Sequence, residues 1–215
     1  MKNKVLVIGA DHHNTLGIVE SLGQKGLNSY VLIVGENINS FVLKSRYVIE
    51  GWVCSSPEQV VDEMLKHFSD TKNKVIVYSS YDNVSSVLDS SVQRLSPFFI
   101  LPVTNMPGSL ERKMSKEYMS DLAREVGLDV PRTWMVSDRK VPADIEFPCI
   151  TKAISSVEGS KKNIKICKKR EELEEFLANS EHCPIIQIQK FIIKDFEFQF
   201  LGCSMDNGKQ IIISG

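Results

Sequence analysis

The stretch KVLVIGADHHNTLGIVESLGQKGLNSYVLIV, residues 4–34, decides the fold of this chain. Its first part (4–10) and its last part (30–34) are apolar runs of strand length, and its middle part (15–25) carries apolar residues at helical spacing. Two strands joined by a helix in this way pair in parallel through a right-handed crossover. The stretch therefore predicts the first unit of an α/β fold.

The same alternation of strand and helix continues as far as residue 105. Parallel strands separated by helices form an open, doubly wound sheet, so we expect a Rossmann-like domain over residues 1–105. The further strands are expected at 47–53, 74–78 and 98–102, and the further helices at 57–68 and 84–95.

Polar residues follow two of these expected strands, at the edge where ligands bind to open α/β sheets. The first loop holds His12 and His13, and the later loop holds Asp82. A small substrate could contact these side chains. The same residue types also cap helices and lie on surfaces without any binding role, so both interpretations stay open.

The first loop also argues against a nicotinamide cofactor. A dinucleotide-binding turn needs glycines at GxGxxG spacing, so that the backbone can approach the pyrophosphate. Here Gly9 is followed by ADHHNTLG, and the fingerprint is absent. A dinucleotide-dependent oxidoreductase is therefore the disfavoured alternative.

The pattern changes after residue 105. Residues 106–135 are expected to form a linker whose helix begins after Ser115 and ends at Gly127. Residues 136–215 are rich in strand patterns, which predicts an antiparallel α+β unit. In this part of the chain, strands are expected at 133–136, 148–153, 163–167 and 185–189, a helix at 171–178, and a hairpin at 196–215 that turns at Asp206, Asn207 and Gly208.

A lysine stands in the apolar strand FPCITKA, residues 147–153. Side chains alternate along a strand, so Lys152 shares a face with Ile150, where an ammonium is unfavourable unless it reaches water or an anion. A Ser/Gly/Lys loop at 155–162 follows at once, and its hydroxyl and amide donors suit an oligophosphate. Phosphate binding and a solvated basic turn both fit these residues.

The composition limits the classes of function. The chain of 215 residues has a net charge of −1, which argues against a general attraction to nucleic acid or to membranes. Its five cysteines are far apart and odd in number, so a reducing cytoplasm fits better than a disulfide framework. The apolar run at the amino terminus is too short for a signal peptide or a membrane span.

The order of several segments resembles the ATP-grasp superfamily. These segments are KMSKEYMSDLAREVGLDVPRTWMV, FPCITKA with its loop, KKREELEEFL and IIQIQKFIIKDFEFQF. The superfamily includes D-alanine:D-alanine ligase, biotin carboxylase and the large chain of carbamoyl-phosphate synthetase, and the chain is especially similar to its predicted carboxylate-amine ligases. The resemblance implies a preATP-grasp domain, a linker helix and the amino-terminal ATP-grasp lobe, with the carboxy-terminal lobe truncated.

The resemblance implies which residues hold the phosphates of ATP. Lys116, eleven residues before Gly127, and Lys152 match the two phosphate-binding lysines of the family. The loop departs from the family pattern, because relatives have more glycine there. The loop residues implied in phosphate binding are Ser155, Ser156, Gly159 and Ser160.

The resemblance also implies an adenine and ribose site. Backbone groups of Lys190 and Ile192 match the hinge that reads the adenine edge, and the side chain of Gln189 would support it. Many relatives have Glu at this position, so Gln189 is a mild departure. Glu197, expected on the next strand, resembles the acidic residue that holds the ribose hydroxyls.

For a complete enzyme the resemblance implies ATP-dependent joining of a small carboxylate to an amine through an acyl phosphate. The family places its Mg²⁺ ligands and an arginine near the transferred phosphate in a later lobe, so no metal ligand and no catalytic residue is assigned here. We expect the chain to bind ATP or ADP weakly and to turn over no substrate. Open strand edges would also allow a homo-oligomer.

The principal alternative is a nonenzymatic nucleotide-binding or regulatory protein that ends at Gly215. A reading frame that continues past this residue would exclude it. The identities of the acid and the amine are not readable from the sequence.

Overall fold

The computed structural model describes residues 3–103, 106–153, 164–180, 185–197, 201–205 and 209–214. The chain divides into two compact units, Met1–Val126 and Gly127–Gly215. Each unit has its own sheet and its own apolar core.

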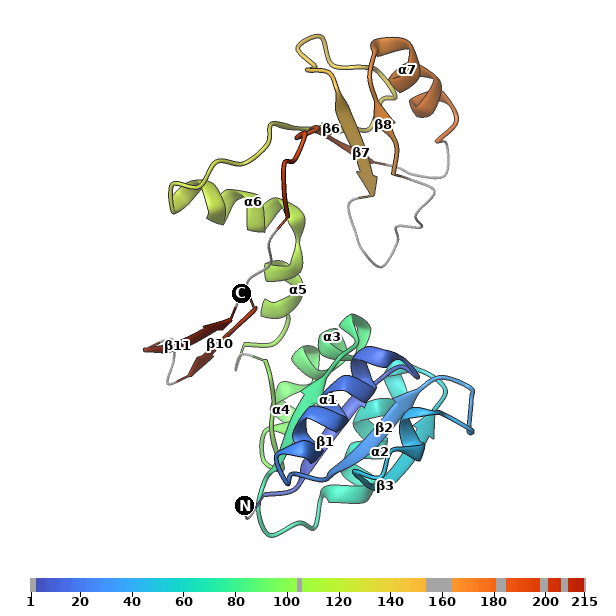
Figure 1. Ribbon diagram of the computed structural model, residues 1–215, viewed down its shortest axis with the longest axis vertical. Helices are drawn as coiled ribbons and strands as arrows, with labels where there is room; N and C mark the ends of the chain where they lie inside the picture. The colour runs from blue at the N-terminus through green and yellow to red at the C-terminus, as the bar shows by residue number, and fades with distance from the viewer. Residues whose placement is uncertain are drawn as a thin grey trace. The chain divides into compact units, whose positions relative to one another are not determined.

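Five strands form the sheet of the first unit (Figure 1). They are β1 (Val5–Gly9), β2 (Ser29–Val34), β3 (Val48–Cys54), β4 (Val75–Ser79) and β5 (Phe99–Ile100). The strand order is β3-β2-β1-β4-β5, and every neighbouring pair is parallel. The order reverses at β1, which is the doubly wound arrangement. The expected parallel α/β sheet is confirmed.

Helices cover both faces of this sheet. They are α1 (His13–Gln24), α2 (Val60–Phe68) and α3 (Asp82–Ser90), with the short helices η1 (Val42–Lys44), η2 (Pro57–Gln59) and α4 (Val92–Leu95). Successive side chains of β1 point to opposite faces, so Val7 packs in the cluster of Val19 from α1, and Ile8 packs in the cluster of Met64 and Leu88 from α2 and α3. Burial on both sides explains the continuous apolar runs of these strands.

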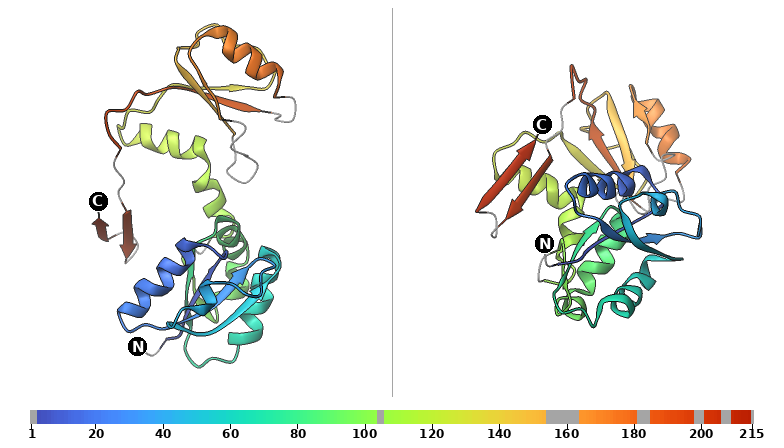
Figure 2. Two further views of the ribbon diagram at one scale, coloured as in Figure 1. Left: turned by 45° about the vertical axis from the view of Figure 1, so that its right-hand side comes forward. Right: turned by 60° about the horizontal axis from the view of Figure 1, so that its bottom comes forward.

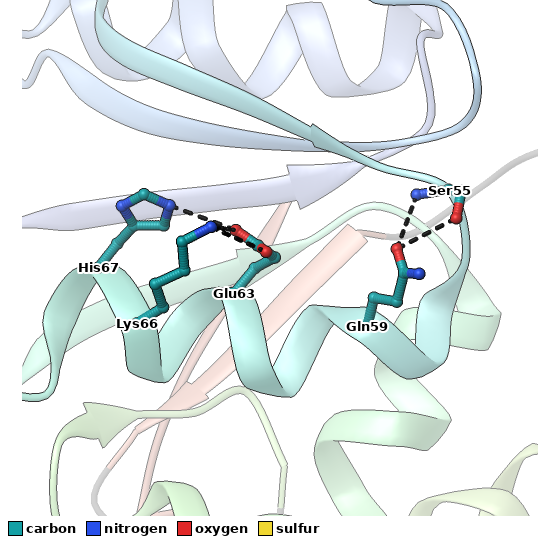
Figure 3. Close-up of polar contacts among 5 residues, drawn as sticks. All are labelled: Ser55, Gln59, Glu63, Lys66 and His67. Atoms are coloured by element: carbon teal, nitrogen blue, oxygen red, sulfur yellow. Dashed lines mark hydrogen bonds and ion pairs between the residues drawn. The ribbon is translucent and has the colours of Figure 1, made fainter.

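Polar contacts around the start of α2 and along its surface have a structural role (Figure 3). Gln59 Oε1 accepts hydrogen bonds from the N–H and the Oγ of Ser55, both at 3.1 Å, and so closes the turn before the helix. Further along, a carboxylate oxygen of Glu63 lies 3.1 Å from Lys66 Nζ and 3.3 Å from His67 Nε2. Contacts at i,i+3 and i,i+4 are ordinary surface interactions of a helix.

Two helical segments differ from the expected set. The single helix expected at 84–95 is two helices, α3 and α4, which meet at Ser91. Ser90 Oγ donates to the carbonyl oxygen of Val87 at 3.0 Å, and serine side chains compete in this way with the backbone bonds of a helix. The other difference is α5 (Ser109–Met114), whose 6 residues are too few to show an apolar period.

The linker helix α6 (Lys116–Glu125) begins and ends at the expected signals. Ser115 Oγ accepts a hydrogen bond from the N–H of Tyr118 at 3.2 Å, which confirms the expected cap. Gly127 has a φ of 79°, a left-handed conformation that glycine adopts at little cost. The sequence signals for both helix ends are therefore confirmed.

The second unit contains a sheet of four strands. They are β6 (Thr133–Val136), β7 (Cys149–Ala153), β8 (Ile166–Cys167) and β9 (Ile186–Lys190). The strand order is β6-β9-β7-β8, and each neighbouring pair is antiparallel. The expected antiparallel α+β unit is confirmed.

Helix α7 (Arg170–Ala178) lies along one face of this sheet, drawn in orange in Figure 2. Its Leu173 and Leu177 form one buried cluster with Cys149, Cys167 and Ile188 of the strands. Cys149 and Cys167 are opposite each other in the register of β7 and β8. Burial, with a smaller effect from the neighbouring thiol, raises the pKa of Cys149 to about 11, so this thiol stays protonated and serves as part of the core.

A separate antiparallel hairpin follows, formed by β10 (Leu201–Met205) and β11 (Gln210–Ser214). The expected pair of strands is confirmed. The turn expected at Asp206, Asn207 and Gly208 lies outside the described residues. Among the helices that the structure does describe, none has the length and apolar character needed to cross a membrane.

Candidate functional site

Lys152 lies on the face of the second sheet opposite α7. Its neighbours Cys149 and Thr151 are 0% exposed and belong to the helix-covered side, whereas Ile150 and Lys152 are only half-buried. Lys152 Nζ donates a hydrogen bond to Gln189 Oε1 at 2.8 Å. The structure therefore brings together two of the residues that the sequence assigns to one nucleotide.

Thr133 extends this contact across a third strand. Gln189 Nε2 donates to Thr133 Oγ1 at 3.2 Å, and Thr133 Oγ1 donates in turn to the carbonyl oxygen of Pro131 at 3.0 Å. An ammonium can only donate, so the oxygen of the Gln189 amide must face Lys152 and its NH₂ group must face Thr133. These hydrogen bonds thus fix the orientations of the Thr133 hydroxyl group and the Gln189 amide group between Pro131 and Lys152.

The expected hinge begins at the end of β9. The N–H of Lys190 donates to the carbonyl oxygen of Arg132 at 2.9 Å, and the N–H of Phe191 donates to that of Pro148 at 2.9 Å. These amides are engaged by the neighbouring strands. An adenine edge would therefore have to be read by other backbone groups of this segment, such as those of Ile192.

The side chain of Lys190 points away from Lys152, because successive residues of a strand alternate between faces. Lys190 Nζ lies 2.7 Å from Glu146 Oε2 and 48% of its side chain is exposed. The hydrogen bond and charge of Lys190, with a further contribution from Arg132, hold the pKa of the Glu146 carboxyl below its usual range. The ammonium of Lys190 is thus part of a surface ion cluster.

Glu197 is not on a strand, and the expected strand start at residue 196 is wrong. Among the described residues, 191–197 contain no strand, and β10 begins at Leu201. Glu197 contacts Lys194, three residues earlier, whereas an extended strand would separate these positions by about 10 Å. The local ion pair indicates a bent segment, and 76% of the Glu197 side chain is exposed.

Part of the expected phosphate site is not described. Ser155, Ser156, Gly159 and Ser160 lie outside the described residues. Lys116 is the first residue of α6, in the first unit, and its side chain also lies outside what the structure describes. Its role in phosphate binding stays a prediction.

The other expected candidates lie at the carboxyl edge of the first sheet. β1 and β4 are neighbours, so the loops that hold His12, His13 and Asp82 emerge side by side. His12 Nδ1 accepts a hydrogen bond from the N–H of Asn14 at 3.2 Å and so caps α1. The ring of His13 is tilted by 37° against that of His12, with centroids 3.8 Å apart, and Asp82 is the exposed first residue of α3. A capping role explains His12, and a favourable position at a helix amino terminus explains Asp82.

Asp11 is a further acidic residue at this edge, and the sequence does not reveal its role. Its carboxylate accepts hydrogen bonds from Ser40 Oγ at 2.5 Å, from the N–H of Val42 at 3.4 Å and from Asn37 Nδ2 at 3.3 Å. These contacts fix the segment between β2 and β3 against the end of β1. Three donors therefore satisfy the oxygens of this partly buried carboxylate.

Gln187 is the buried polar residue nearest in register to Lys152. It stands directly opposite Lys152 on β9 and is 5% exposed. Within the described part of the chain, its Oε1 has no hydrogen-bond partner. The alternation IQIQ in β9 is the sequence signal for both Gln187 and Gln189, whereas nothing in the sequence shows that Thr133 lies opposite Gln189.

No protein-family model and no curated protein matches this sequence. Solved structures do match its fold. An L-amino acid ligase from Bacillus licheniformis has a TM-score of 0.63 at 17% identity, over 89% of this chain and 45% of that one. An N5-carboxyaminoimidazole synthase from Aspergillus clavatus, in complex with ADP and an aminoimidazole ribonucleotide, has a TM-score of 0.64 at 12% identity, over 99% and 53%.

The fold is that of the ATP-grasp ligases. The biotin carboxylase domain of a Hydrogenobacter thermophilus 2-oxoglutarate carboxylase, in complex with MgADP and bicarbonate, shares the fold with a TM-score of 0.58 at 13% identity, over 88% of this chain and 44% of that one. The chain spans about half the length of these ATP-grasp structures. It therefore shares the α/β architecture of about half of each of these chains.

Among the described residues, no three His, Cys, Asp or Glu side chains come together in a way that could hold a metal ion. The groups on the candidate face of the second sheet are an ammonium and two amides, from Lys152, Gln187 and Gln189. An ammonium suits a phosphate, and amides suit the polar edge of a nucleobase. The chemistry of these groups makes this face a candidate site for a nucleotide.

Proposed function

We propose that this chain is the nucleotide-binding, amino-terminal portion of an ATP-dependent carboxylate-amine ligase. The observation that carries the proposal is the hydrogen bond of 2.8 Å between Lys152 and Gln189, on the open face of a sheet whose fold is that of ATP-grasp ligases. This contact supports a single nucleotide site in which Lys152 binds a phosphate and Gln189 lies next to the adenine.

The roles follow from the chemistry of each group. Lys152 supplies a compact positive charge to a phosphate, the segment from Lys190 to Ile192 borders the adenine, and Lys116 and the loop at 155–160 complete the phosphate site. Glu197 would contact the ribose hydroxyls after its ion pair with Lys194 opens. The loops with His12, His13 and Asp82 are the proposed place for the small substrate, at the carboxyl edge of the first sheet.

When ATP is bound to a ligase of this kind, it supplies the phosphoryl group that converts a carboxylate into an acyl phosphate, from which an amine displaces phosphate to form an amide. The proposed partners of the full enzyme are thus a small carboxylate, an amine and ATP. We place the ligands of Mg²⁺ in a later lobe and derive no step through the metal. We expect the 215 residues alone to bind nucleotide weakly, without turnover, in a cytoplasmic setting.

The proposal is tested by the thermal midpoint of the protein in the presence of ATP, ADP, AMP or NAD. A ligand that binds only the folded state raises the midpoint by mass action. Because Lys152 is expected to meet phosphate beyond the ribose, ATP and ADP should raise the midpoint, AMP should raise it less, and NAD should leave it unchanged. A rise with NAD and none with ATP or ADP would contradict the proposal and favour an oxidoreductase.

A further inference from the structure

Three side chains form a hydrogen-bonded network across β6, β9 and β7. Lys152 donates to Gln189 at 2.8 Å, Gln189 donates to Thr133 at 3.2 Å, and Thr133 donates to a backbone carbonyl oxygen at 3.0 Å. All three side chains are half-buried and lie on one face of the sheet, because Thr133 is directly opposite Gln189. We call these residues the Thr133–Gln189–Lys152 network.

The network has only one arrangement that satisfies its donors and acceptors. If the Gln189 amide were reversed, its NH₂ group would face the ammonium of Lys152, and two donors would meet. Thr133 holds the amide in the productive orientation by accepting from its NH₂ group while its own proton goes to Pro131. The backbone of Pro131, just before β6, thus helps to fix the position of an ammonium two strands away.

The neutrality of the Gln189 amide is relevant to the charge of Lys152. An amide oxygen accepts a hydrogen bond from the ammonium without adding a negative charge, so the pair as a unit keeps a net positive charge. Holding a long lysine side chain in one rotamer costs conformational entropy. A lysine that is already held loses less of this entropy when an anion binds.

We propose that Thr133 and Gln189 are positioning residues that hold Lys152 in the orientation in which it meets the nucleotide phosphates. This inference deepens the proposed function and rests on it for the identity of the anion. Thr133 contacts no phosphate itself and acts through Gln189.

The first test needs no nucleotide. Acetylation of Lys152 by N-hydroxysuccinimidyl acetate is followed by mass spectrometry in the parent protein and in Gln189→Met and Thr133→Val. Because a hydrogen bond to a charged group contributes about 1.5 to 3 kcal/mol, its loss should raise the rate at Lys152 roughly tenfold to a hundredfold in Gln189→Met. A smaller rise in the acetylation rate is expected in Thr133→Val, where the Gln189 amide remains but loses its hydrogen bond to the Thr133 hydroxyl group.

Two matched variants control this test. Thr133→Ser keeps the hydroxyl group and should react at the parent rate. Gln24→Met makes the same change at an exposed residue of α1, in the first unit, and should also leave the rate at Lys152 unchanged. If Lys152 were acetylated at the parent rate in both Gln189→Met and Thr133→Val, the Thr133–Gln189–Lys152 network would be contradicted.

The second test measures ADP affinity by calorimetry in the same proteins. Gln189→Met should weaken binding roughly tenfold and Thr133→Val roughly threefold, while Thr133→Ser should stay close to the parent because a hydroxyl remains. Unchanged ADP affinity in variants with faster acetylation would overturn the positioning role. Absence of ADP binding to the parent would instead contradict the proposed function, and the acetylation rates would still decide on the network.

Discussion

Replacing Lys152 with methionine is expected to weaken ADP binding roughly tenfold to a hundredfold. The side chain keeps its length and apolar stem but loses the ammonium that Gln189 holds at 2.8 Å on the open face of the second sheet. A hydrogen bond to a charged group contributes about 1.5 to 3 kcal/mol, and each 1.4 kcal/mol corresponds to about a tenfold change in affinity. Isothermal titration calorimetry with ADP measures the difference directly.

Lys168→Met is the matched control for this change. Lys168 is exposed, belongs to the same unit and precedes α7, away from the proposed site. The control should bind ADP as the parent does, apart from the small effect of removing one exposed charge. Equal ADP affinity of Lys152→Met and the parent would show that the ammonium of Lys152 is only solvated. It would contradict a role for Lys152 in phosphate binding.

Replacing Gly23 with alanine is expected to destabilise the first unit by about 2 kcal/mol. A Cβ atom at Gly23 would lie 2.1 Å from Cγ and 2.4 Å from Cδ1 of Tyr47, so the ring or the helix must move. Overpacking of this kind costs about 1 to 3 kcal/mol or more, and the better helix propensity of alanine offsets up to about 1 kcal/mol. Urea unfolding followed by Trp52 fluorescence, in a Trp134→Phe background, reports on the first unit.

Gly17→Ala tests the same chemical change on the same helix. Gly17 is exposed on α1, and a Cβ atom there would have no neighbour within 4 Å. Only the helix propensity changes, so this variant should be stabilised by up to about 1 kcal/mol. The packing of α1 against Tyr47 would be contradicted if both alanine variants shifted the unfolding midpoint in the same direction.

Much of the fold could be predicted because local sequence signals agree with the tertiary structure. Ser115 and Gly127 mark the two ends of α6, and both are confirmed by a cap and by a positive φ. The alternation in FPCITKA correctly separates Cys149 on the buried face from Lys152 on the open face. In each case a single residue type has a strong physical preference for the position it occupies.

The errors occur where a contact outside the local pattern decides the structure. Ser90 bonds to the backbone and separates two helices that share one apolar pattern. Glu197 pairs with Lys194, which is incompatible with the strand that its aromatic neighbours suggest. Thr133 could not be recognised at all, because its role depends on the register of β6 against β9.

The candidate site was predicted in part for the same reason. Lys152 and Gln189 could be recognised from motif order and are joined in the structure, while the contact itself depends on strand pairing. His12 shows the opposite case, since its loop position suggests a ligand but its Nδ1 caps α1. Residue type alone does not separate a cap from a binding group.

The central claim is that the open face of the second sheet binds the nucleotide, and backbone amide chemical shifts during an ADP titration test it most directly. The account predicts that the largest shifts occur at Lys152, Gln189 and Ile192, on β7, on β9 and in the segment after it. Shifts confined to residues 11–13 and 80–82, at the carboxyl edge of the first sheet, would contradict it, as would the absence of any shift.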